Sequence, residues 1–165
     1  MPPRPVGASI GDARLAGEGL LRWFGLRVYE ARLWVGAGPF DADRLHASEF
    51  ALELRYARAL AGQAIATASR DEIARLGFGT AAQRSAWFDA MARMFPDVGA
   101  GDRITGVHRP GRGVSFYRDD APIGRVEDPE FGPAFFAIWF HPKTASPELR
   151  EALLGSERAT GPRPR

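Results

Sequence analysis

Apolar and polar side chains alternate along residues 26–35, which follow an aromatic-rich apolar run at residues 20–24 and a glycine at position 25. This two-residue period is typical of a β-strand and puts five side chains on one face: Arg27, Tyr29, Ala31, Leu33 and Val35. A strand of ten residues is longer than most, so we expect it to lie centrally in a sheet. Each face mixes apolar bulk with one or two polar groups, which suits a sheet with helices on one face and partial cover on the other.

The same period predicts further strands, and a longer period predicts helices. Strands are expected at residues 12–16, 50–56, 103–109, 113–118 and 122–126, of which the last three form a meander. Apolar residues that repeat about every 3.6 positions predict helices at residues 60–76, 80–95, 128–141 and 146–154. Gly77 is expected to end the first helix and Thr80 to cap the second.

These elements predict one domain over residues 12–155, without an internal repeat or a linker. The chain has 165 residues, which is enough to bury a core of its own. Residues 1–11 are rich in proline and are predicted to form a flexible N-terminal segment. Residues 156–165 are predicted to form a disordered tail.

Composition and charge remove several function classes. A net charge of +2, with arginines scattered along the chain, does not indicate a nucleic-acid partner. The absence of cysteine excludes disulfides, thiol nucleophiles and cysteine-ligated metals. No apolar run is long enough to span a membrane, and the first residues lack the apolar core of a signal peptide. The residues leave the cellular compartment and the oligomeric state open.

The sequence contains no GxSxG motif, no P-loop and no dinucleotide-binding fingerprint. His46, His108 and His141 have no partner at the spacing of metal ligands, so we expect no metal site. The carboxylate pairs at 119–120 and 127–128 are adjacent in sequence and fit solvated turns better than an acid–base couple. We therefore assign no catalytic residue and no cofactor.

The candidate site consists of polar groups on otherwise apolar strands. Tyr29 and Arg27 lie on the long strand, and Tyr56 and Arg58 lie at the end of its expected neighbour. A tyrosine beside an arginine can hold the head of an anionic amphiphile, because arginine offers a charged fork and tyrosine a neutral donor. The alternative is a tyrosine with its hydroxyl at the rim of the core and arginines that reach toward water.

Four stretches resemble the bacterial chalcone isomerase-like family: GLLRWFGLRVYEARLWV from residue 19, FALELRYARALAGQAI from residue 50, FPDVGAGDRI from residue 95, and FYRDDAPIGRVEDPEFGPAFFAIWFHPKTASPELREALLG from residue 116. They occur in order over nearly the whole chain. The resemblance implies an α+β fold, an open-faced β-sandwich. In this fold a large antiparallel sheet carries helices on one face and a smaller set of strands on the other.

The resemblance does not extend to the residues of the plant isomerases. Their threonine falls on Tyr29, their lysine on Tyr56, their tyrosine on Ile65 and their asparagine on Glu72, and their arginine falls near Gly17. Each lost donor typically costs a factor of about 10²–10³ in rate. We therefore do not expect this chain to cyclise chalcones.

A non-catalytic branch of the same superfamily binds fatty acids and is similar in carrying a tyrosine on the long strand, which Tyr29 matches. The main hypothesis is a chalcone isomerase-like protein that binds a small apolar or amphipathic ligand between its sheet and helices, with Tyr29, Tyr56, Arg27 and Arg58 at the polar end. One alternative is an isomerase or lyase of an enone-like substrate. Another is a structural or interaction protein without a ligand. Relatives are commonly exported, but this chain shows no leader.

Overall fold

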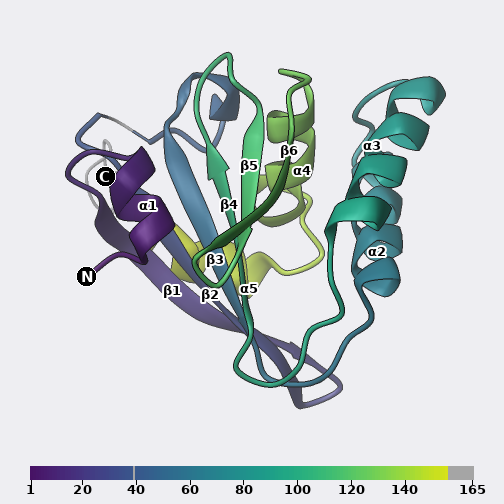
Figure 1. The fold of residues 1–165 in the computed structure, drawn as a ribbon, viewed down its shortest axis with the longest axis horizontal. Coiled ribbons are helices and arrows are strands. Elements are labelled where there is room, and N and C mark those ends of the chain that lie inside the picture. The colour runs from purple at the N-terminus through teal and green to yellow at the C-terminus, as the bar shows by residue number, and fades with distance from the viewer. Residues whose placement is uncertain (39, 156–165) are drawn as a thin grey trace, which may run out of the picture.

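Six antiparallel strands form one sheet in the order of the sequence, so that each strand pairs with the next (Figure 1). The computed structural model describes residues 1–38 and 40–155. Its strands are β1 (Arg14–Trp23), β2 (Leu26–Val35), β3 (Phe50–Tyr56), β4 (Arg103–His108), β5 (Val114–Arg118) and β6 (Ala121–Val126). The bounds of β2 and β3 agree with the predicted strands, and the three-strand meander β4–β6 is also present.

Strand β1 is longer than the sequence indicated. The glycines in its middle, Gly17 and Gly19, separate two short apolar segments, and the alternation pattern treated these segments as separate. Pairing with β2 keeps this middle extended, and a Cβ atom at Gly17 would collide with the carbonyl oxygens of Ala152 and Leu153. Glycine is therefore needed here because a helix packs directly on the strand backbone.

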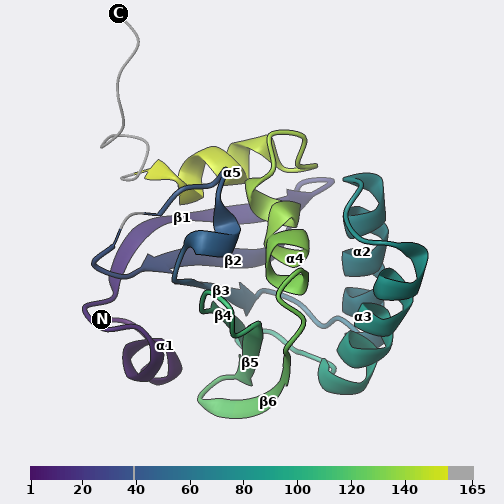
Figure 2. The same cartoon turned by 90° about the horizontal axis from the view of Figure 1, so that it is seen from above.

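Four helices pack on one face of the sheet, as Figure 2 shows from above. They are α2 (Gly62–Arg75), α3 (Ala81–Met94), α4 (Phe131–Phe140) and α5 (Pro147–Leu153), with a short 3₁₀ turn, η1, at Leu45–Ala47. Thr80 caps α3 as predicted: its hydroxyl accepts from the Gln83 N–H at 3.0 Å, and the Gln83 side chain accepts from the Thr80 N–H at 2.9 Å. Gly77 follows α2 in the left-handed conformation, with φ of +87°.

Helix α4 is the centre of the core. Eight of its ten residues are buried, and its phenylalanines interlock with rings from β3 and β5 in edge-to-face pairs such as Phe50–Phe136 and Phe116–Phe135. The fold class predicted from the sequence, a large antiparallel sheet with helices on one face, is thus confirmed.

The N-terminal segment differs from the prediction. Residues 1–11 were expected to be flexible, but the structure has a helix α1 (Arg4–Ser9) there, because Val6 and Ile10 are buried against Trp34 and Val107. These contacts lie on the sheet face opposite α4. Helix α1 thus lies where the resemblance implied a smaller set of strands. The tail predicted at residues 156–165 lies outside the described residues.

Candidate functional site

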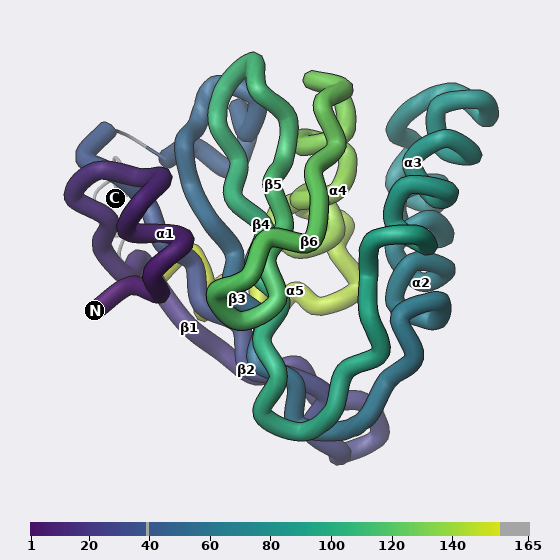
Figure 3. The backbone as a smooth tube through the Cα atoms, viewed as in Figure 1, coloured from purple at the N-terminus to yellow at the C-terminus, as the bar shows by residue number. Residues whose placement is uncertain are grey.

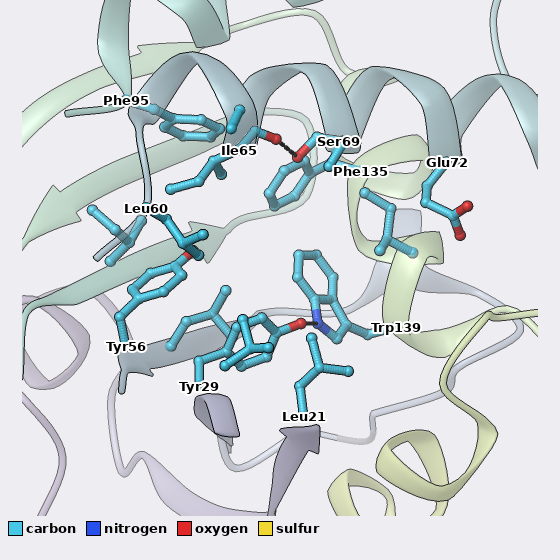
Figure 4. Close-up of a pocket in the computed structure, with 16 residues that line it drawn as sticks. Leu21, Tyr29, Tyr56, Leu60, Ile65, Ser69, Glu72, Phe95, Phe135 and Trp139 are labelled. Atoms are coloured by element: carbon cyan, nitrogen blue, oxygen red, sulfur yellow. Dashed lines mark hydrogen bonds between the residues drawn. The ribbon is translucent and has the colours of Figure 1, made fainter. Parts of the chain in front are cut away.

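A cleft of about 410 Å³ lies between the sheet and helices α2 and α4 (Figure 4). The sheet contributes side chains from four strands: Leu21, Val28, Tyr29, Leu54, Tyr56 and Ile104. The opposite wall consists of Leu60, Ala64, Ile65, Ala68, Ser69, Glu72, Phe95, Phe135, Ile138 and Trp139. Most of these side chains are aliphatic or aromatic, so the cleft presents mainly apolar surface.

Tyr29 and Tyr56 lie side by side in the cleft because they are partners in the β2–β3 register. Their ring centroids are 5.6 Å apart and the rings meet at 73°, an edge-to-face pair. The Trp139 indole Nε1–H donates a hydrogen bond of 2.9 Å to the Tyr29 phenol oxygen, visible as a dashed line in Figure 4. This bond ties the sheet to α4 across the floor of the cleft.

Burial keeps both phenols neutral. Desolvation raises the pKa of Tyr29 to about 12, against a smaller opposing effect of the hydrogen bond from Trp139. Desolvation also raises the pKa of Tyr56, and the neighbouring Tyr29 adds to this rise. At neutral pH the two groups therefore act as neutral hydrogen-bond donors and acceptors, and neither serves as a base.

The hydrogen-bond pattern leaves the phenol protons available. The Tyr29 oxygen accepts from Trp139, so its own O–H is free to donate, and within the described residues it has no acceptor. The Tyr56 hydroxyl has no hydrogen-bond partner among those residues either. The Ser69 hydroxyl, by contrast, donates to the Ile65 carbonyl at 2.8 Å. The cleft thus offers two O–H donors against an apolar background.

Among the described residues, Glu72 is the one carboxylate that lines this cleft, and its charge is already balanced. Arg75 donates to both Glu72 oxygens at 2.9 Å, and its guanidinium also donates to the Lys143 carbonyl at 2.9 Å. The pair therefore links α2 to the loop that follows α4. A charge held in this way contributes a polar rim and leaves no unpaired ion inside the cleft.

The structure brings together two of the four residues predicted for the site. Tyr29 and Tyr56 line the cleft, whereas Arg27 and Arg58 are exposed and do not line it. Arg27 lies near the β1–β2 turn, opposite Arg22 in the strand register. Its place on the Tyr29 face of the strand does not bring it to the cleft, because the strand extends beyond the covering helices.

Sequence reasoning missed the contribution of α4. Phe135, Ile138 and Trp139 form a wall of the cleft, but their helical spacing indicated only a buried face. The available signal was the Trp139 indole N–H, a donor that needs an acceptor when it is buried. Among the described residues, no three histidine or carboxylate side chains gather where they could hold a metal ion.

The four positions on which the resemblance placed plant catalytic residues meet in this cleft. Tyr29, Tyr56, Ile65 and Glu72 all line it, although they come from two strands and one helix. The donors expected at the first three positions are replaced by two neutral phenols and an aliphatic side chain.

Comparisons with known proteins agree with this architecture. The family model described as "Chalcone isomerase-like" matches residues 8–155. The crystal structure of a fatty-acid binding protein from Arabidopsis thaliana has a similar fold, with a TM-score of 0.68, 14% sequence identity and coverage of 92% of each chain. No curated protein matches the chain. The family match over nearly the whole described length shows that this chain belongs to the chalcone isomerase-like family.

Proposed function

We propose that the protein binds a small apolar or amphipathic ligand, such as a fatty acid, in the cleft beside Tyr29. The observation that carries this proposal is an apolar cavity of about 410 Å³ with two phenol donors in its wall. Sites for small molecules typically have volumes of about 300–1,000 Å³ and a few polar groups among apolar walls. The cavity therefore supports binding over the alternative of a structural protein whose cleft is filled.

The polar groups suggest how such a ligand would lie. Its acidic or polar head would accept hydrogen bonds from Tyr29 and Tyr56, whose protons have no other acceptor among the described residues. Its alkyl chain would pack on the aliphatic side chains of β3, β4 and α2. Arg27 and Arg58, also predicted for the polar end, are exposed and have no part in this arrangement. The fatty-acid binding protein of similar fold supports the same class of ligand.

Titration calorimetry with oleic acid tests the proposal. Ala68 lines the cleft from α2, so Ala68→Phe fills part of the cavity and should weaken binding by at least about tenfold. The matched control is Ala86→Phe, which adds the same side chain at an exposed position of α3 outside the cleft. The proposal fails if the wild-type protein does not bind, or if Ala68→Phe binds as tightly as the control.

A catalytic alternative draws on one observation, the free O–H of Tyr29, which could act as a general acid on an enone-like substrate. Tyr29→Phe removes this proton and keeps the ring. If the wild-type protein isomerises members of a panel of enones and this variant is equally fast, Tyr29 is not the acid.

A further inference from the structure

The turn between β1 and β2 exposes three large apolar side chains. Trp23, Phe24 and Leu26 have 66%, 86% and 52% of their surface accessible. Trp23 and Phe24 contact each other, with ring centroids 4.8 Å apart. We call residues 22–27 the hairpin tip. An apolar group of this kind on a projecting turn is typical of a binding surface.

Phe24 is an unusual residue for the backbone conformation of the hairpin tip. Phe24 has φ of +50° and Gly25 φ of +78°, so both central residues of the turn are left-handed. Such turns favour Asn, Asp or Gly at the first position, because a bulky side chain is strained there. We therefore expect the turn itself to be more stable with Asn than with Phe at this position. We infer that Phe24 is present for what it contacts outside the chain.

Cations surround the apolar tip. Arg22 and Arg27 face each other across the hairpin register, both are exposed, and neither forms an ion pair within the described residues. Arg58, also exposed, lies in the next loop at this end, where the Ala57 N–H donates to the Val28 carbonyl at 2.9 Å. The tip therefore combines exposed aromatic side chains with positive charge.

The hairpin tip adjoins the cleft. Leu21 and Val28, which flank the tip on β1 and β2, both line the cavity together with Leu60. Figures 1 and 3 show the tip at the same end of the molecule as the start of α2. A surface bound by the tip would therefore lie close to a ligand in the cleft.

We propose that the hairpin tip docks on an anionic lipid bilayer, with Trp23, Phe24 and Leu26 in the headgroup region and Arg22 and Arg27 on lipid phosphates. Tryptophan favours this interface, and cationic side chains near it are attracted to anionic lipids. The proposal rests on the ligand-binding function above, since docking would place the cleft beside a source of apolar ligand. A small projecting tip can insert its apolar side chains among lipid headgroups. A protein interface instead needs a closely packed surface of complementary shape.

Co-sedimentation with vesicles tests the proposal directly. The wild-type protein should bind to vesicles of equimolar phosphatidylcholine and phosphatidylglycerol. It should bind much less to vesicles of phosphatidylcholine alone. Trp23→Ser combined with Phe24→Asn should lower binding by at least about tenfold, because it removes the inserting rings. Asn is well suited to the left-handed turn, so this variant keeps the hairpin.

A pair of charge variants separates local from overall charge. Arg22→Gln with Arg27→Gln should weaken binding to the anionic vesicles about thirtyfold, from the loss of two cations near the surface. The matched control is Arg109→Gln with Arg112→Gln, which removes the same charge beside the β4–β5 turn, at the opposite end of the sheet. Equal loss in both pairs would overturn the proposal.

The remaining outcomes are distinct. If oleic acid binds in solution but vesicles do not, the docking proposal is wrong and the cleft proposal stands. If the protein binds vesicles but not oleic acid, the cleft proposal fails. The docking proposal then stands, but without a ligand in the cleft. A dimer in sedimentation velocity that the Trp23→Ser, Phe24→Asn variant dissociates, together with no vesicle binding, would show that the tip contacts a second copy of this chain and would overturn the proposal.

Discussion

Tyr29 combines three properties that depend on its neighbours. Its register on β2 places it beside Tyr56, the indole of Trp139 fixes its oxygen, and burial holds its proton. A phenol in water loses its proton near pH 10, but here the surrounding apolar side chains disfavour the phenolate. Tyr29 therefore stays a donor over the whole physiological range, which is what a hydrogen bond to a carboxylate requires.

The raised pKa of Tyr29 predicts an alkaline loss of stability. Between pH 10 and 12 the unfolded chain ionises at this tyrosine while the folded chain keeps the proton, so the free energy of unfolding falls as the pH rises. The free energy of unfolding of the Tyr29→Phe variant should fall less steeply with pH, by up to about 1.4 kcal/mol per pH unit in this window. Urea denaturation across the window measures both slopes, and identical slopes would contradict the assignment. Below pH 10 this tyrosine contributes no pH dependence.

At the scale of single elements, the sequence predicts those strands and helices whose formation depends mainly on neighbouring residues. Strands β2 and β3 alternate regularly, and α3 carries a capping box, so their bounds could be predicted from neighbouring residues alone. Helix α1 could not be predicted in this way. Its proline-rich sequence has little helical preference, and burial of Val6 and Ile10 against a distant strand stabilises it.

The β1–β2 hairpin permits a direct measurement of its strain. Phe24→Asn should raise the free energy of unfolding by up to about 1 kcal/mol, because Asn adopts the left-handed conformation more readily than Phe. Gly25→Ala at the next position should lower it by about 1 kcal/mol, since alanine is strained at this φ. Thermal or urea unfolding measures both. A loss of stability in Phe24→Asn would show that the ring packs usefully within the chain.

At the scale of the whole molecule, the cleft forms where strands and helices that are far apart in the sequence meet. Tyr29 and Tyr56 could be predicted as a pair because adjacent strands bring them together. The wall from α4 could not, because no local signal says which helix lies over which strand. Arg27 and Arg58 were assigned to the cleft by their position on the strands, but the end of the sheet projects beyond the helices and leaves both in solvent.

Helix α2 is the wall of the cleft that should respond most to a ligand. Its small residues Ala64 and Ala68 line the cavity, so part of its inner face has no packing partner in the free protein. A bound alkyl chain would bury that face. In Figure 2 the α2–α3 pair lies beside α4.

Hydrogen exchange of backbone amides should therefore slow in α2 when oleic acid saturates the protein, because the ligand opposes local opening of this helix. Amides of β5 and β6 that exchange by local fluctuation serve as an internal control, since neither strand lines the cleft. The Ala68→Phe variant should show no ligand-dependent change in α2. Equal protection of α2 and the β5–β6 hairpin, or protection that persists in Ala68→Phe, would place the ligand elsewhere on the molecule.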